Sequence, residues 1–481
     1  MSRIVRNYLY NAAYQLLVLL VPVITAPYLS RTLGAANLGI YSFVNSSGSI
    51  VTSISLLGIY SYGNRQTAYV RDSKDELTRT FWELMCTRLI LGTAGTAIYA
   101  VYILCNRNVS LYLILYYPFI LAQFLDCSWV YVGLEDMRPP VMKNFATKLI
   151  TVIGIFLFVG KKEDVWIYIL LLAVTTLAAN VSIYFQLPRY IGRCRVNPRN
   201  MLHHVKGSIH LFLPQLALIL YLQIDKVMLK WLTGTTSPIS YYDQAEKIIY
   251  IPLTLITVMS SVMMPRLANE FKKKNHKVME SLLLKAGKYT LFLALPMMTG
   301  IFLIARQFIP WYLGDGFLPS AYAMMILAPI ILFTSLSEIS GIQYFTATNQ
   351  IHVLIKSNVS ALTVNIAVNA ALIPAYGYAG AAVATVLSSL VAVCIQYYYL
   401  TRQMNVRPLL KSGLNYLAAS SVMAVMICFP TRRMEAAPFT TFLQVLTGVT
   451  VYGLILWTAK DEMLMELLST AAKKIRKGKG D

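Results

Sequence analysis

Residues 165–187 read VWIYILLLAVTTLAANVSIYFQL, a run of 23 residues without one charged side chain. At about 1.5 Å per residue, a helix of this length crosses the roughly 30 Å hydrocarbon core of a bilayer. The run does not alternate polar and apolar residues, as a membrane-spanning β-strand does. Because lipid admits only helices and closed barrels, this stretch predicts a transmembrane helix.

Runs of this kind recur along the whole chain and decide the fold class. Of the 481 residues, 57% are hydrophobic and only 13% are charged. Soluble domains carry a larger share of charged residues on their surfaces. We therefore expect an all-α polytopic membrane protein with about fourteen transmembrane helices. The expected spans are 8–33, 37–62, 80–104, 109–133, 139–160, 164–190, 208–232, 240–264, 284–308, 320–345, 350–374, 378–402, 411–430 and 438–459.

Basic residues gather in alternate loops between these runs. The net charge is +21, and five segments are strongly basic: Arg65–Arg79, Arg189–Lys206, Arg266–Lys277, Arg402–Lys411 and Lys460–Lys479. The opposite loops hold few Lys or Arg. This is the positive-inside pattern, and it predicts an even number of spans with both termini in the cytoplasm. The same placement argues against nucleic-acid binding, because no folded basic domain lies outside the spans.

A repeat at an offset of 200 residues relates the two halves of the chain. The matches that carry weight are Gln15 with Gln215, Gly34 with Gly234, Tyr41 with Tyr241 and, after one insertion, Arg65 with Arg266. The first span of each half runs in the same direction. We therefore expect two pseudo-symmetric six-helix lobes, 1–200 (spans 1–6) and 201–405 (spans 7–12), with a ligand site between them. A helix pair, spans 13–14, follows in 406–460.

Residues 461–481 form a basic tail with apolar residues at helical spacing. The apolar positions are Leu464, Leu467, Leu468, Ala471 and Ile475. This pattern favours an amphipathic helix on the cytoplasmic leaflet, with a solvated basic tail as the alternative.

Cysteine and histidine spacing gives no sign of a metal or disulfide site. The six cysteines are scattered without a CxxC pair, so we expect buried free thiols. His203 and His204 stand in a basic segment with no carboxylate or cysteine nearby in the sequence. We expect no metal there and no cofactor elsewhere.

Polar and charged side chains inside the apolar runs are the candidate functional residues. An ionised group at the bilayer centre costs about 2.5 kcal/mol or more, so each one needs a reason. For substrate binding we expect Gln15, Arg31, Arg65, Arg88, Gln215, Lys226, Lys247, Arg266 and Asn365. For coupling to an ion, H+ or Na+, the candidates are Asp126, Asp225, Glu246 and Glu338.

Structural roles stay open for each of these residues. Serine and asparagine stripes often hold helices together by packing and hydrogen bonds. Arg31, Arg65 and Arg266 lie near span ends, where their charged heads can snorkel to the interface. Asp225 beside Lys226 can form a structural pair, and so can Glu246 beside Lys247. As a set, the polar faces predict a wet, partly cationic cavity.

One group of motifs resembles the N-terminal region of a known protein family. It consists of PYLSRTLG at 27–34, LGIY at 38–41 and GNR at 63–65. That family is the polysaccharide-transport branch of the multidrug/oligosaccharidyl-lipid/polysaccharide (MOP) exporter superfamily. QIDKVML at 223–229, with 241–247, resembles its second half. The likeness in layout covers almost the whole chain.

The resemblance implies a MOP/MATE-like fold of two six-helix lobes plus a final helix pair. The class most similar to this chain is the Wzx-type flippase of the bacterial plasma membrane, which carries an undecaprenyl-diphosphate-linked sugar repeat unit. It implies that Arg31, Arg65 and Arg266, with Asp225 and Lys226, contact the lipid diphosphate. It also implies lipid-linked oligosaccharide and membrane lipids as partners, together with polymerases and glycosyltransferases of the same pathway.

We therefore expect a flippase that works by alternating access in capsule or cell-surface polysaccharide synthesis. One alternative is a flippase for lipid II or another lipid-linked precursor, although this sequence lacks the arginine-rich first helix of MurJ-type flippases. Another is a cation-coupled multidrug antiporter, which calls for an anionic cavity. A polymerase or ligase needs a sizeable outward loop, and no expected outward loop exceeds about 15 residues. We expect a transporter and not an enzyme.

Overall fold

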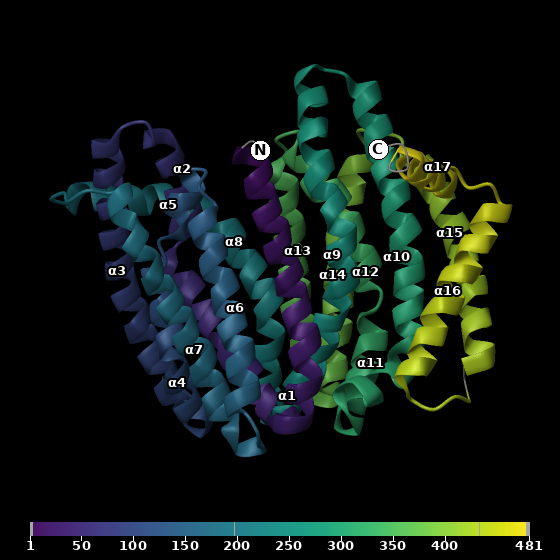
Figure 1. Cartoon of the computed structure of the whole chain (residues 1–481), viewed down its shortest axis with the longest axis horizontal. Helices are drawn as coiled ribbons and strands as arrows, with labels where there is room; N and C mark the ends of the chain where they lie inside the picture. Colours follow the sequence, from purple (N-terminus) through teal and green to yellow (C-terminus); the bar gives the residue numbers. More distant parts are fainter. Residues whose placement is uncertain (1–2, 197, 432, 478–481) are drawn as a thin grey trace. The chain divides into compact units, whose positions relative to one another are not determined.

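Helix accounts for nearly all of the computed structural model, which describes residues 3–196, 198–431 and 433–477 (Figure 1). These residues contain no β-strand, so the predicted all-α class is confirmed. Contacts divide the chain into two compact units, Met1–Ser240 and Tyr241–Asp481. The predicted lobes 1–200 and 201–405 stay a prediction.

Each predicted span lies largely on helix. Within the described ranges, nine helices are long and apolar enough to cross a membrane, or up to twelve if each bent pair is one span. A polytopic membrane protein is therefore confirmed, whereas the number fourteen stays a prediction.

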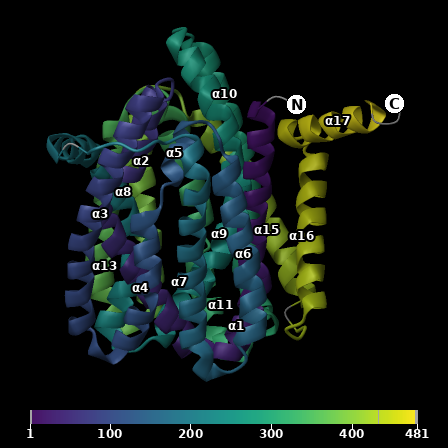
Figure 2. The ribbon, with the colours of Figure 1, turned by 60° about the vertical axis from the view of Figure 1, so that its left-hand side comes forward.

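The first unit consists of long helices and short connecting turns (Figure 2). Its α-helices are α1 (Arg3–Leu56), α2 (Ile59–Val70), α3 (Lys74–Cys105), α4 (Ser110–Leu125), α5 (Ser128–Gly133), α6 (Arg138–Phe158), α7 (Val165–Ser182) and α8 (Pro198–Thr233). Three 3-10 turns lie between them, η1 (Arg107–Val109), η2 (Lys162–Asp164) and η3 (Ile183–Arg189). Helix α4 packs on α7, and α8 packs on α1, α2 and α3.

The second unit is built in the same way. Its α-helices are α9 (Ser237–Lys272), which begins just before the boundary, α10 (His276–Leu313), α11 (Leu318–Leu327), α12 (Ile330–Ser337), α13 (Ile351–Tyr376), α14 (Tyr378–Thr401), α15 (Arg407–Thr431), α16 (Pro438–Thr458) and α17 (Glu462–Lys477). A 3-10 turn, η4 (Asp315–Phe317), precedes α11, and a π-helical turn, η5 (Glu338–Thr346), follows α12. Helix α13 packs on α14, while α10 packs on α15 and α16.

Gly34 separates the first two predicted spans. Its backbone leaves the helical region, with φ 74° and ψ 172°, so Arg3–Leu56 is two helical segments joined at this residue. Gly234, its partner in the predicted repeat, also has a positive φ, 70°, directly after α8. Only glycine adopts this region without strain, which explains why the repeat keeps glycine at both turns.

The cysteines and the tail differ from expectation in detail. All six thiols are free, but only Cys127 is buried, and Cys105, Cys194, Cys394 and Cys428 are exposed on the protein surface. The expectation of buried thiols is wrong because helix faces that look apolar in sequence also point away from the protein. The tail forms α17; its contact with a leaflet stays a prediction.

Candidate functional site

Polar side chains of α1 and α2 meet polar side chains of α8 inside the first unit. Ser46 Oγ donates a hydrogen bond to Gln223 Oε1 at 2.7 Å. Eight residues earlier on α8, Gln215 Nε2 donates a hydrogen bond to Ser61 Oγ at 2.6 Å. We call these four residues the α1–α8 polar contact. It joins two serines of the second expected span to two glutamines of the seventh.

Further polar groups surround this contact. Tyr116 donates from its hydroxyl to Asn45 Oδ1 at 2.8 Å, next to Ser46 in the chain. On α8, Asp225 and Lys226 follow Gln223 and are 1% and 6% exposed. Several predicted site residues therefore lie on the same two helices. Gln215 and Gln223 hold α8 to α2 and α1, and amide and hydroxyl groups of this kind also bind hydroxyl-rich ligands.

Side chains from three other elements cap the C-terminal end of α4. A helix leaves its last four carbonyls without intrahelical partners. Each of these carbonyls accepts a bond here: Ala122 O from Asn180 Nδ2 (2.7 Å), Gln123 O from Arg88 Nη2 (2.5 Å), Phe124 O from Arg88 Nε (3.1 Å), and Leu125 O from the Tyr184 hydroxyl (2.6 Å). In lipid, such a helix break is tolerated only when its backbone is satisfied in this way.

The predicted substrate ligand Arg88 thus holds a helix end. It is 2% exposed, and its positive charge lies at the negative end of the α4 dipole. Its Nη1 atom has no hydrogen-bond partner among the described residues.

Asp126 lies in the break between α4 and α5 and binds a cation of its own unit. Its Oδ1 accepts hydrogen bonds from the Ser128 backbone N at 3.1 Å and the Ser128 hydroxyl at 2.5 Å. Lys143 Nζ of α6 is 3.3 Å from the same oxygen and also donates to Asn180 Oδ1 at 2.8 Å. The structure therefore brings the predicted residues Arg88 and Asp126 to one helix break, where both support the backbone.

A buried cluster around Glu83 joins α2, α3 and α8. Glu83 Oε1 accepts from Asn200 Nδ2 at 2.6 Å and from Arg79 Nε at 3.2 Å. His204 Nε2 lies 3.2 Å from Glu83 Oε2, and its Nδ1 lies 3.2 Å from the Tyr62 hydroxyl. The expectation that His204 lacks a carboxylate partner is wrong. Its partner stands 121 residues earlier in the chain, and no local pattern marks the pair.

In the second unit, two predicted charges of α9, Lys247 and Glu246, contact side chains one turn away on the same helix. Lys247 Nζ binds Asp243 Oδ2 at 2.6 Å, one helical turn away. The Tyr242 hydroxyl is 3.5 Å from Glu246 Oε1 and 2.9 Å from the Thr385 hydroxyl of α14. Lys247 therefore forms its ion pair with Asp243 and not with its chain neighbour Glu246.

Two other predicted residues of this unit lie at separate places. Asn365 is fully buried on α13 and accepts from Asn369 Nδ2 at 3.1 Å. Glu338 is half-buried and begins the π-helical turn η5. Such turns occur often at functional positions of helices.

The remaining predicted residues are arginines near helix turns, and one glutamine. Arg31 is exposed and donates to Pro27 O at 3.2 Å, whereas Arg65 is exposed and stands 5.7 Å from the Tyr62 ring centroid. Arg266 is exposed on α9. The side chain of Gln15 lies outside the described residues. No group of three or more His, Cys, Asp or Glu suited to a metal occurs in the part of the chain that was described.

Comparison with known sequences gives one family and several distant relatives. A family model described as "Polysaccharide biosynthesis protein" matches residues 4–271. A putative O-antigen transporter of Escherichia coli (strain K12) is 23% identical over 356 residues, which cover 72% of this chain and 84% of that protein. A probable low-salt glycan biosynthesis flippase of Haloferax volcanii is 23% identical over 241 residues, 50% of each chain.

Comparison with solved structures confirms the predicted MOP/MATE-like fold. The lipid II flippase MurJ in an inward closed conformation matches with a TM-score of 0.73 and 16% identity, covering 95% of this chain and 100% of that one. An inward-facing MATE family multidrug resistance transporter of the MOP superfamily matches with a TM-score of 0.64 and 15% identity, covering 83% and 96%. At these identities the likeness shows the fold alone.

Proposed function

The chain belongs to the polysaccharide biosynthesis protein family, and from this premise we propose that it is a Wzx-type flippase and not an enzyme. Its cargo is an undecaprenyl-diphosphate-linked oligosaccharide repeat unit, carried from the cytoplasmic to the outer leaflet of a bacterial plasma membrane. The product serves a capsule or another cell-surface polysaccharide. The relatives named as O-antigen transporter and glycan flippase support this assignment.

The observation that carries the proposal is the α1–α8 polar contact between two membrane helices. A sugar hydroxyl taken into hydrocarbon without a partner costs on the order of several kcal/mol. The Ser46–Gln223 and Ser61–Gln215 bonds supply donors and acceptors that exchange between helix–helix bonds and bonds to sugar. When α1 and α8 separate, these groups can solvate the headgroup while the polyprenyl tail stays in lipid.

Exposed arginines offer a place for the diphosphate. Arg65 and Arg266 form no ion pair with an acidic side chain among the described residues. A guanidinium stays charged and donates two parallel hydrogen bonds, which suits phosphate oxygens. Arg31 precedes the span 37–62 and Arg65 follows it, so we propose that Arg31 contacts the diphosphate at the opposite membrane face, after transfer.

The direction of transport follows from charge. With both termini in the cytoplasm, an anionic cargo moving outward gains about 2.3 kcal/mol per charge per 100 mV of interior-negative potential. Resetting the empty carrier then requires a coupling ion, H+ or Na+. Asp225, Glu246 and Glu338 are the proposed ion sites, while Asp126 is the weaker candidate because Lys143 binds it. Polymerases and glycosyltransferases of the pathway are the proposed partners.

Flipping in proteoliposomes tests the proposal. A fluorescent undecaprenyl-diphosphate oligosaccharide is placed in both leaflets, and an impermeant quencher reports the outer pool. The protein is expected to expose the inner pool, whereas empty liposomes retain it. Arg65→Ala combined with Arg266→Ala is expected to slow flipping, and Arg195→Ala, an exposed arginine of a basic loop, is the control. No acceleration over empty liposomes overturns the function; wild-type flipping in the double variant overturns only the diphosphate role.

A further inference from the structure

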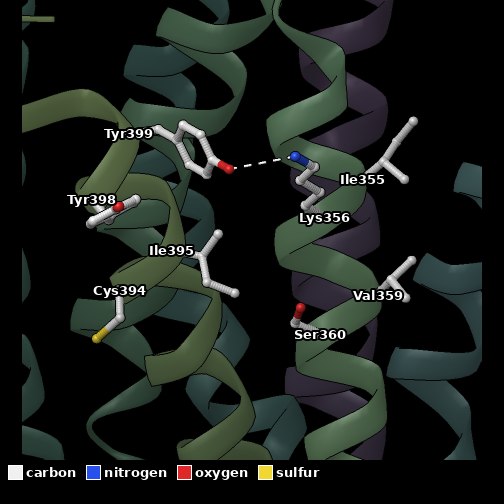
Figure 3. Close-up of a pocket in the computed structure, with 8 residues that line it drawn as sticks. All are labelled: Ile355, Lys356, Val359, Ser360, Cys394, Ile395, Tyr398 and Tyr399. Atoms are coloured by element: carbon white, nitrogen blue, oxygen red, sulfur yellow. Dashed lines mark hydrogen bonds between the residues drawn. The ribbon is translucent and has the colours of Figure 1, made fainter. Parts of the chain in front are cut away.

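A groove runs between α13 and α14 in the second unit, with a volume of about 700 Å³ (Figure 3). Ile355, Val359 and Ile395 give it apolar walls, and Cys394 lines it with a free, exposed thiol. Figure 3 shows Lys356 and Tyr399 pointing toward one another across the gap between the helices. The groove thus combines an apolar wall with one cationic position.

Lys356 is an exposed cation within a membrane-spanning helix. Helix Ile351–Tyr376 is long and apolar enough to cross a bilayer, and Lys356 stands one and a half turns from its start. Its Nζ is 3.5 Å from the Tyr399 hydroxyl and 5.7 Å from the ring centroid. Among the described residues it has no carboxylate within ion-pair distance. So near the end of the helix, the Lys356 ammonium can reach the interface, where anionic headgroups attract it.

The position of Lys356 along the helix suits an anion at headgroup depth. Helix α14 ends at Thr401, directly before the basic segment Arg402–Lys411, which the charge pattern predicts to be cytoplasmic. Arg402 stands over the Tyr398 ring at 4.3 Å and donates to the Tyr398 hydroxyl. Among the donors of the groove, Lys356 and Tyr399 lie nearest to this segment, and the Ser360 hydroxyl lies one turn further along α13. Anionic lipids of the cytoplasmic leaflet attract such groups.

We propose that this groove binds an anionic phospholipid of the cytoplasmic leaflet. The lipid phosphate accepts from Lys356 Nζ and the Tyr399 hydroxyl, and an acyl chain lies along Ile355, Val359 and Ile395. One ammonium and one hydroxyl match a single phosphate better than a diphosphate, which requires more cations. The occupant is therefore a membrane phospholipid and not the lipid-linked cargo, and the site is independent of the proposed flipping.

Cys394 is a native reporter for this site. The purified full chain is placed in nanodiscs of phosphatidylcholine alone or with phosphatidylglycerol, and the rate of Cys394 alkylation by a membrane-permeant maleimide is followed by peptide mass spectrometry. Phosphatidylglycerol is expected to slow Cys394 about fivefold, the effect of one lysine beside an anionic lipid. Cys105 of α3, read in the same sample, is expected to react at the same rate in both lipids.

Variants assign the protection to the groove cation. Lys356→Gln is expected to remove the lipid dependence, whereas Lys356→Arg keeps it. Lys411→Gln, which removes a basic residue of the segment Arg402–Lys411 outside the groove, is the matched control and is expected to keep it. Equal Cys394 rates in the two lipids overturn the proposal, as does protection that survives Lys356→Gln. Protection by undecaprenyl phosphate in phosphatidylcholine, with none by phosphatidylglycerol, overturns the choice of occupant.

Discussion

Glu83 shows how one buried carboxylate fixes the start of α8 to α2 and α3. It is 4% exposed and bonded by Asn200 and His204 of α8 and by Arg79 of its own helix. Gly207, one turn after His204, carries no side chain, and an added Cβ would come within 2.6 Å of the Tyr62 ring. The close approach of Tyr62 to α8 therefore depends on this glycine.

Glu83→Gln is expected to lower stability. It removes the charge that His204 and Arg79 share, and hydrogen bonds to a charged group contribute about 1.5–3 kcal/mol. Thermal unfolding in detergent measures the loss. The control is Glu135→Gln. Glu135 Oε1 pairs with Arg71 Nη1 at 2.7 Å on the protein surface, and exposed ion pairs contribute about 1 kcal/mol or less to stability. Equal unfolding temperatures for the two variants would contradict a structural role of Glu83.

The substitution Arg88→Lys distinguishes a helix-capping role of Arg88 from a substrate-binding role. A lysine ammonium cannot reach Gln123 O and Phe124 O with the fixed fork of arginine, so we expect destabilisation of about 1–3 kcal/mol from an unsatisfied buried carbonyl. Hydrogen exchange is expected to accelerate at the first backbone amides after the capped turn. Unchanged stability with slower flipping would instead assign Arg88 to the cargo.

These residue roles differ in how far the sequence predicts them. Gln215 was predicted as a site residue from its place in the repeat, and it does face the first half of the repeat through Ser61. The role of Arg88 was not predictable, because its partners are backbone carbonyls. Every residue has one, so the sequence does not mark which carbonyls Arg88 contacts. The Glu83–His204 pair escaped prediction because its members stand on separate helices with no common period.

Helices α1 and α8 are the elements on which the two halves of the repeat meet. The segment of α1 after Gly34 lies against the turn after α8: a Cβ at Gly39 would fall 1.9 Å from Thr236 O. That approach is possible only for glycine, since even a methyl group would displace backbone. The spans were predictable from hydropathy; this contact between backbones was not, because it depends on tertiary packing.

Gly39→Ala is expected to separate α1 from this turn. Relieving the overlap requires a backbone shift, and overpacking of this kind costs about 1–3 kcal/mol or more. Gly300→Ala of α10 is the control, because its added Cβ meets nothing within 4 Å. Folded yield and unfolding temperature measure both. A Gly39→Ala protein with unchanged yield and unfolding temperature would show that the turn at Thr236 can move away from α1 at no cost in stability.

On the scale of the whole molecule, transport requires that some contacts break while others hold. The capped end of α4 is of the second kind, because opening it would strand four carbonyls in lipid. The α1–α8 polar contact is of the first kind, because its side chains exchange one polar partner for another at little cost. This division can be tested by tying each contact shut.

A reversible bifunctional thiol reagent ties the helices in a variant whose six native cysteines are serine. Joining Ser46→Cys to Gln223→Cys is expected to stop the flipping that the untied double variant retains, because α1 and α8 can no longer part, and reduction is expected to restore the untied rate. Joining Ala122→Cys to Asn180→Cys at the end of α4 is the control, and its flipping rate is expected to be the same before and after tying. Full flipping with α1 and α8 tied would remove the polar contact from the transport path, because the cargo would then cross without any separation of these two helices.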